Sequence, residues 1–228
     1  AGVGHGISAT LRSQAACRCG MNGLVMSARG LIVAIVVVYM LMLFGGAALK
    51  PGYSHIGQYI SELNAIGTAR ASLVGWLGFV PFGLLSGLLL VMTSSKAPVR
   101  GVSRLGYWLL LAEPVAYVGA ALAPCDAGCP GQGSLSQRVH NGLGALTYLA
   151  TTLGLMLLAT TPKLGAGRRA MWVVLALVWF GLFATMLESS FDPWRGILQR
   201  MAEWIVYPSL LLAAWRIHDP TGSAAAST

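Results

Sequence analysis

The chain has 228 residues, of which 56% are hydrophobic and only 10% are charged, and its mean hydropathy is +0.69. A soluble domain carries roughly 25% charged residues, so this chain has too few charges to cover a water-facing surface. These proportions exclude a soluble globular enzyme, a disordered protein and a collagen-like fibre. They predict an all-α polytopic membrane protein that contacts membrane lipids. The chain has a net charge of +8, which is typical of a membrane protein whose cytoplasmic loops are rich in Lys and Arg. We therefore expect no nucleic-acid partner.

The first part of the chain, residues 1–29, precedes the first long apolar run. It is rich in Gly, Ser and Ala and lacks the apolar core of a standard signal peptide. We expect a flexible cytoplasmic segment in which Met21 or Met26 is a candidate natural start.

Six stretches are long and apolar enough to cross the roughly 30 Å hydrocarbon core as helices. They predict one six-helix transmembrane domain over residues 30–217, followed by a disordered tail over residues 218–228. Small residues inside the second stretch, such as Gly78 and Gly83, predict close packing between helices. The stretches are residues 31–49, 71–93, 105–124, 139–161, 170–189 and 200–216.

The third stretch contains a carboxylic acid next to a proline, Glu113 and Pro114. Proline lacks a backbone N–H and kinks a helix, which leaves a carbonyl without its usual partner. We expect a protonated Glu113 to bond to that freed backbone group.

The basic residues are unevenly divided between the two ends of the predicted helices. Ten of them fall on the side of both chain ends and five on the other side. By the positive-inside rule this predicts a protein of the cell membrane with both termini in the cytoplasm. Of the seven acidic residues only Asp219 lies on the cytoplasmic side, so the outer end collects most of the negative charge.

The first outer loop, residues 53–65, is amphipathic when it is drawn as a helix. It predicts a short helix that lies in the outer interface or over the mouth of the bundle. Two interpretations are open: the helix only seals the interface, or its polar face caps a polar cavity. That polar face consists of Ser54, His55, Gln58, Ser61 and Glu62.

The second outer loop holds Cys125 and Cys129 on either side of Asp126. In an oxidising compartment such a pair forms a disulfide, which is the prediction we favour. Free thiols and zinc are the alternatives, but one cysteine pair falls short of the four ligands of a structural zinc site. We therefore expect no metal and no cofactor.

His140 opens the fourth stretch, where it is either a hydrogen-bonded anchor or a proton acceptor activated by a carboxylate. Glu203 has Arg200 one turn before it, so that pair can simply neutralise itself. The candidate binding residues share a place at the outer end of the predicted bundle, and they are His55, Gln58, Glu62, Asp126, His140, Glu188 and Glu203.

Two ordered sets of residues carry a resemblance to a known family. The first set is Gly52-Tyr53, then Ile60-Ser61-Glu62-Leu63 and a glycine-rich helix from Gly78 to Gly87, and the second is Pro124, Asp126 and His140. Over about residues 31–216 the chain resembles the prokaryotic multi-pass family catalogued as domain of unknown function 998. The resemblance implies the fold and topology and groups Ser61, Glu62, Asp126 and His140, but it assigns no reaction.

Three functions from different classes fit these patterns. The first, which we favour, is the binding of a small molecule or lipid headgroup in a polar outer-leaflet pocket, without chemistry. The second is an intramembrane lipid hydrolase or transferase in which His140 is the base or a metal ligand, Asp126 or Glu62 orients it and Ser61 is the nucleophile. A metal version would need His55, His140 and a carboxylate. The absence of paired histidines at helical spacing counts against it. The third is a structural subunit with a membrane-protein partner.

Overall fold

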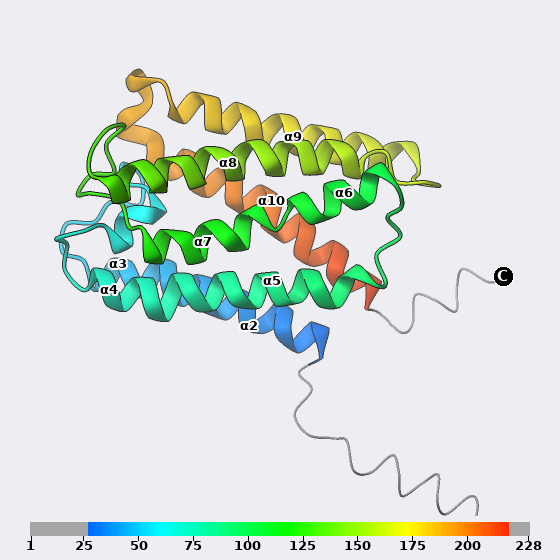
Figure 1. The fold of residues 1–228 in the computed structure, drawn as a ribbon, viewed down its shortest axis with the longest axis horizontal. Helices are drawn as coiled ribbons and strands as arrows, with labels where there is room; N and C mark the ends of the chain where they lie inside the picture. The colour runs from blue at the N-terminus through cyan, green and yellow to red at the C-terminus, as the bar shows by residue number, and fades with distance from the viewer. Residues whose placement is uncertain (1–26, 219–228) are drawn as a thin grey trace, which may run out of the picture.

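The computed structural model describes residues 27–218, and within that range the chain forms helices and no strand. The helices run side by side along one long axis (Figure 1). The prediction of an all-α helical bundle is therefore confirmed. In chain order the helices are α2 (Ala28–Met40), η1 (Leu41–Gly45), α3 (Gly46–Ala48), η2 (Ile60–Asn64), α4 (Ala71–Val74), η3 (Gly75–Phe79), α5 (Val80–Ser94), α6 (Val102–Leu109), α7 (Ala112–Leu122), α8 (Leu135–Leu158), α9 (Ala166–Met186), η4 (Ser189–Trp194) and α10 (Arg195–Ile217).

Consecutive helices join into longer helical segments, which we call rods. Within the described residues, five rods are long and apolar enough to cross a membrane: Ala28–Ala48, Ala71–Ser94, Val102–Leu122, Leu135–Leu158 and Ala166–Met186. The sixth rod, α10, has the length to do so but carries more charge. Two of its charged side chains, Arg200 and Glu203, are buried inside the bundle. We therefore treat the chain as a six-helix membrane bundle.

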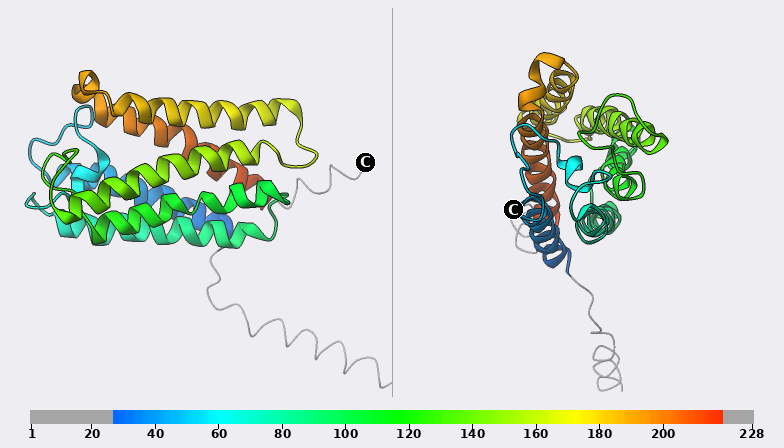
Figure 2. Two further views of the ribbon diagram at one scale, coloured as in Figure 1. Left: turned by 45° about the horizontal axis from the view of Figure 1, so that its top comes forward. Right: turned by 90° about the vertical axis from the view of Figure 1, so that its left-hand side faces the viewer.

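The rods close into one bundle because α10 returns to pack against α2 as well as α9 (Figure 2). One apolar core joins α2, α5 and α7, and a second joins α6, α8, α9 and α10. Large apolar side chains such as Leu77, Leu84 and Leu146 remain more than half exposed on the outside. An apolar exterior of this kind is suited to lipid contact.

The third rod is broken where Pro114 predicts a kink. α6 ends at Leu109 and α7 begins at Ala112, two residues before the proline. Pro114 cannot donate to the carbonyl four residues back, and its ring crowds that residue, so the helix bends there.

Helix packing depends on glycine, as predicted. A Cβ atom at Gly83 would lie 2.7 Å from the Pro114 carbonyl oxygen, and one at Gly78 would lie 2.8 Å from Met42 Cγ. The same holds at Gly106 and Gly154, where α6 crosses α8 with the two backbones in contact. Such approaches exclude any larger residue.

The amphipathic helix predicted over residues 53–65 is wrong for most of its length. Residues 53–59 form turns, and only the five-residue 3-10 helix η2 follows. Its Glu62 is buried rather than displayed on a polar face. The wheel pattern misled because this loop is fastened by side chains from α10, which replace the intrahelical hydrogen bonds.

Helix ends also differ from the hydropathy boundaries. α8 begins at Leu135, because Ser134 caps it by accepting a hydrogen bond from the Gln137 amide at 3.1 Å, and α10 begins at Arg195. In both cases the first turns are polar, so hydropathy places the start four or five residues too late. Most of the predicted flexible segment, the two candidate start residues and most of the predicted tail lie outside residues 27–218. The last residues of that segment, Ala28 and Arg29, are already in α2.

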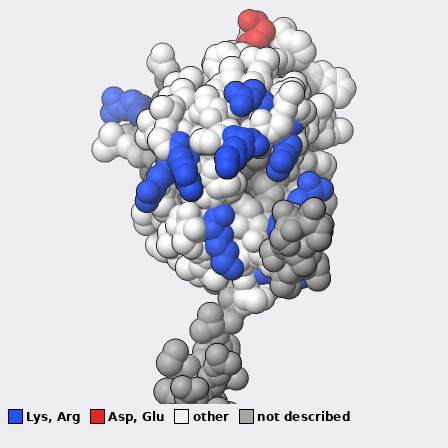
Figure 3. Space-filling model, turned by 90° about the vertical axis from the view of Figure 1, so that its right-hand side faces the viewer, with Lys and Arg blue, Asp and Glu red and all other residues white. Residues whose placement is uncertain are grey.

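The bundle has two different ends. We call the end with residues 49–70, 123–134 and 187–194 the disulfide end, and the opposite end, where the described chain begins and finishes, the terminal end (Figure 1). Lys and Arg side chains gather on the face of the terminal end (Figure 3). Those in the loops and helix ends there are Arg29, Lys96, Arg100, Arg104, Lys163, Arg168, Arg169 and Arg216.

Candidate functional site

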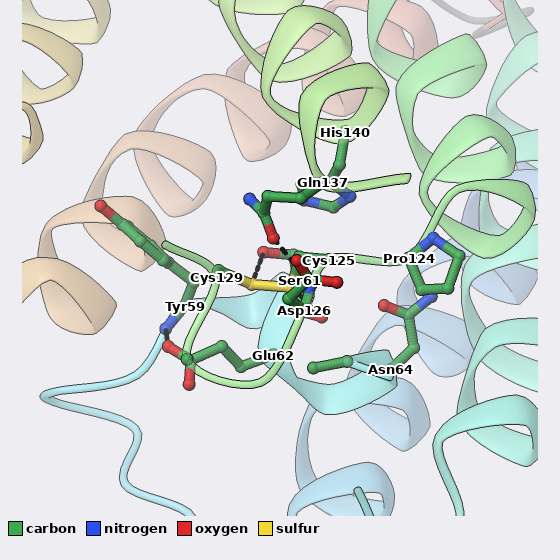
Figure 4. The surroundings of a disulfide bond; sticks show 12 residues. Tyr59, Ser61, Glu62, Asn64, Pro124, Cys125, Asp126, Cys129, Gln137 and His140 are labelled. Atoms are coloured by element: carbon green, nitrogen blue, oxygen red, sulfur yellow. Dashed lines mark hydrogen bonds between the residues drawn. A yellow bond between two sulfur atoms is a disulfide. The ribbon is translucent and has the colours of Figure 1, made fainter. Parts of the chain in front are cut away.

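A disulfide closes the loop after α7. Cys125 and Cys129 are bonded through their sulfur atoms, with Cα atoms 5.1 Å apart (Figure 4). Gly128, with φ of 81°, turns the chain between them through the left-handed region that favours glycine. Ser61 of η2 packs on this loop, and its Oγ lies 3.4 Å from Cys129 Sγ. The predicted disulfide is thus present and lies against η2.

Asp126 fastens the disulfide loop to the start of α8. Its carboxylate accepts hydrogen bonds from the backbone amide and the hydroxyl of Ser134, both at 2.8 Å. Its own amide donates to Gln137 Oε1 at 2.7 Å. The two bonds from Ser134 lower the pKa of Asp126 below its ordinary value. Asp126 therefore has a complete set of local partners that hold the loop.

Glu62 fastens the first loop to α10. Its carboxylate forms an ion pair with Arg195 at 3.1 Å and accepts hydrogen bonds from the Tyr59 amide and Gln58 Nε2, at 3.0 and 2.9 Å. Arg195 also donates to the Gly128 carbonyl at 2.9 Å. A single guanidinium thus joins η2, the disulfide loop and α10. No motif or spacing in the sequence marks Arg195 for this role.

Arg200 is the second fastener, and only 1% of it is exposed. Its NH1 donates to the carbonyls of His55, Gln58 and Gly196 at 2.8–3.0 Å, and its NH2 donates to the Tyr53 hydroxyl. Burial raises the pKa of Tyr53 to about 12. Burial and the nearby Arg200 lower the pKa of His55. Arg200 therefore serves the loop, and the predicted pairing with Glu203 is not its main role.

His140 lies one and a half turns into α8, half-buried beside the disulfide. Its Nδ1 donates to the Ala123 carbonyl at 3.0 Å, which leaves Nε2 as an acceptor. His140, Cys125 and Cys129 each place one possible metal-ligand atom within 4.8 Å of the others. Both sulfur atoms are used by the disulfide, so only the reduced protein can offer these three ligands to a metal.

A cavity of about 90 Å³ lies inside the bundle below η2 and the disulfide. It has room for several water molecules. Residues from η2, η3, α7, α8, α9 and α10 line it, and it is partly open to the outside. His140 lies at the part nearest the disulfide, and Thr147 lies about 10 Å farther along α8 at 1.5 Å per residue. The polar lining residues are Ser61, Glu113, Tyr117, His140, Thr147, Tyr148, Gln199 and Glu203.

Glu113, at the start of α7, is buried on the wall of this cavity. Its carboxylate accepts hydrogen bonds from Tyr207 at 2.5 Å and from Thr151 at 3.0 Å. The expected bond to the backbone freed by Pro114 is wrong. Thr147 instead donates to a nearby carbonyl, that of Ala112, at 3.2 Å. The hydroxyls that reach these groups come from two other helices, α8 and α10.

Glu203 of α10 is the second buried acid in the cavity wall. Its Oε2 accepts hydrogen bonds from the hydroxyls of Tyr39 at 2.6 Å and Tyr117 at 2.7 Å. These tyrosines come from α2 and α7, so one carboxylate atom joins three helices. An acid held in this way in the middle of a membrane bundle is a candidate functional group.

The structure divides the residues that the sequence singled out. Ser61, His140 and Glu203 line the cavity, whereas the other members belong to separate contacts at the disulfide end. Glu62 points away from His140 toward the Tyr59 amide (Figure 4). Glu188 is exposed at the start of η4. The residues that do not line the cavity are His55, Gln58, Glu62, Asp126 and Glu188.

Sequence reasoning missed most of the deeper wall, including Tyr117, Tyr148 and Gln199. The available signal was an acid inside each of two apolar stretches, Glu113 and Glu203, because buried acids need partners. Which aromatic residues supply those partners depends on how the helices are rotated, and periodicity alone does not give that.

These features define a polytopic membrane protein built as one helical bundle, with a cavity lined by apolar side chains and a few polar ones. The model of a family described as a protein of unknown function (DUF998) matches residues 32–216. The chain belongs to that family. No curated protein and no solved structure matches it.

Proposed function

We propose that the protein binds a small molecule or the headgroup of a lipid in the cavity between η2, α7, α8 and α10. The proposal rests on one observation: two buried carboxylates, Glu113 and Glu203, line an internal cavity of an apolar bundle. An acid at the centre of a membrane helix costs about 2.5–3.5 kcal/mol on insertion scales. Tyrosine and threonine hydroxyls offset part of this cost, and a bound ligand can offset more.

The contacts of His140 favour binding over catalysis. A hydrolase or transferase of the predicted kind needs a carboxylate to orient the imidazole. Nδ1 of His140 donates instead to a backbone carbonyl, while Glu62 and Asp126 are engaged with Arg195 and Ser134. We therefore propose a binding role without a catalytic dyad.

The cavity can be filled without disturbing the helices, which supplies the test. Gly144 lines the cavity, and a Cβ atom there meets nothing within 4 Å. Replacing Gly144 with leucine is expected to abolish the ligand retained by protein purified in mild detergent, measured by native mass spectrometry. Gly142→Leu is the matched control, because Gly142 has equal space and does not line the cavity.

Wild-type protein and Gly142→Leu should carry the same bound mass, and Gly144→Leu should lack it. A wild-type protein that retains nothing, or a Gly144→Leu variant that retains the same species, would contradict the proposal. The second result would favour a structural role in a larger membrane complex, which does not depend on an occupied cavity.

We also propose that the disulfide end faces the outside of the cell membrane and that both termini are cytoplasmic. Support comes from the basic residues at the terminal end and from a disulfide at the opposite end, because disulfides persist in oxidising compartments.

Thiol labelling of intact cells tests this placement. In a background with Cys17 and Cys19 replaced by serine, an impermeant maleimide should label Cys125 and Cys129 only after an impermeant reductant is added. Cys125→Ser should expose Cys129 to labelling without reductant. Labelling only after the membrane is permeabilised would place this end in the cytoplasm, and ready labelling of the parent protein would exclude the disulfide in cells.

A further inference from the structure

We infer that the ligand of this cavity is a positively charged amine, either a free ammonium compound or the ammonium headgroup of a lipid. The inference rests on the proposed function, because it names the class of ligand that the same cavity takes. Three separate observations carry it: the charge of the lining, an unused acceptor atom and the aromatic walls.

The cavity lining is acidic and has no cation of its own. It contains Glu113 and Glu203 and, among residues 27–218, neither Lys nor Arg. The arginines in the first turns of α10 are committed elsewhere: Arg195 pairs with Glu62, and the NH1 and NH2 groups of Arg200 donate to carbonyls and to Tyr53. A cation that enters the cavity therefore meets two acids and, in the described part of the chain, no Lys or Arg side chain in the lining itself.

One carboxylate oxygen is free to accept from such a ligand. Both hydrogen bonds to Glu203 end on Oε2, from Tyr39 and Tyr117. Within the described part of the chain Oε1 has no hydrogen-bond partner, although only 4% of Glu203 is exposed. A cationic nitrogen is the complement of this atom. A primary ammonium donates an N–H to it in a charged hydrogen bond, and a quaternary ammonium is attracted to it by charge alone.

The apolar walls are aromatic rather than aliphatic on several sides. Phe79 and Tyr117 line one part, with ring centroids 5.5 Å apart. Tyr148 and Trp179 line another, with centroids 4.7 Å apart. Aromatic rings attract organic cations, and together with carboxylates they are typical of ammonium recognition. A phosphate group would find neither Lys nor Arg among the described residues of this lining, so only the amine end of a phospholipid suits the cavity.

The free-amine experiment compares choline with 3,3-dimethylbutan-1-ol, its uncharged carbon isostere. In detergent solution, choline chloride at a hundredfold excess over its Kd should raise the melting temperature of wild-type protein by about 5–10 °C relative to equal NaCl. The isostere should not. Glu203→Gln, which keeps an amide oxygen for Tyr39 and Tyr117, should weaken the choline response at least about tenfold.

Glu188→Gln is the matched control, because Glu188 is an exposed acid near the same end that does not line the cavity. It should respond to choline as wild type does. If Glu203→Gln does not fold, Gly144→Leu is the second variant, because it blocks the cavity and leaves both acids in place.

The lipid arm uses nanodiscs made with phosphatidylethanolamine, phosphatidylcholine or phosphatidylglycerol. Native mass spectrometry should find one retained lipid with either of the first two and none with phosphatidylglycerol, which has no amine. A response to choline without a retained lipid would identify a free amine as the source, and a retained lipid without a choline response would identify the headgroup.

In one contrary outcome, phosphatidylglycerol binds as well as the amine lipids, or the uncharged isostere as well as choline, and this binding is lost in Gly144→Leu. That result would overturn the proposal of an amine ligand but would leave the proposal that the cavity binds a ligand. A stabilisation by Na⁺ or Mg²⁺ that depends on Glu203, with no amine effect, would replace the amine by a metal ion. If neither Gly144→Leu nor Glu203→Gln changes the binding of any probe, both the amine proposal and the proposed binding function are wrong.

Discussion

Arg200→Ala should lower the melting temperature of the protein in detergent by about 10 °C or more. The substitution removes the donor for three backbone carbonyls and for the Tyr53 hydroxyl. Each polar group left unsatisfied costs about 1–3 kcal/mol, and 1 kcal/mol corresponds to about 2–4 °C for a domain of this size. Differential scanning fluorimetry on purified protein measures the change.

The control for Arg200→Ala is Arg138→Ala, at an exposed position on the first turn of α8. It should melt within about 2 °C of wild type, because an exposed arginine contributes little to stability. Arg200→Lys should fall between the two, since an ammonium has three donors but cannot span the same acceptors. If Arg200→Ala melts like wild type, the loop of residues 53–59 is held by something other than this side chain.

Gly106→Ala should also destabilise the protein strongly, by about 2–3 kcal/mol, although it adds a single methyl group. A Cβ atom at this position would lie 2.6 Å from Leu157 Cβ and 2.7 Å from the Gly154 carbonyl oxygen. The second neighbour is backbone and cannot swing aside, so α6 must move away from α8. The expected fall in melting temperature is about 5–10 °C.

Gly142→Ala is the matched control for Gly106→Ala. It lies in α8 with no atom within 4 Å of the added Cβ. Because alanine has a higher helix propensity than glycine, by about 1 kcal/mol, this variant should melt at or above the wild-type temperature. Equal effects of the two substitutions would mean that α6 and α8 do not cross as closely as described.

The basic residues at the terminal end and the disulfide at the opposite end support the proposed orientation together. The basic residues were visible in the sequence, because the positive-inside rule acts on short loops without reference to packing. The same counting did not reveal that Arg195 and Arg200 are fasteners of a loop. Their role depends on where residues 55–62 pass over α10, which is a long-range contact.

For Glu113 in the cavity wall, the sequence likewise revealed the residue but not its contacts. Glu113 was recognisable as an expensive acid in an apolar stretch, yet its predicted partner was wrong. Its real partners, Tyr207 and Thr151, come from two other helices, separated from it by 94 and 38 residues along the chain. A hydropathy profile records that a helix can enter lipid, but it does not record which face turns inward.

From the sequence alone follow the class of protein, the six long helices, the break near Pro114, the need for glycine between helices and the pairing of Cys125 with Cys129. These depend on composition, on local backbone chemistry or on short spacing. Only the tertiary structure decides that Glu113 and Glu203 share a cavity with His140, while Glu62 and Asp126 hold loops. That choice is made by helix rotation and crossing, because an acid inside a membrane bundle takes whichever donors the neighbouring helices bring to it.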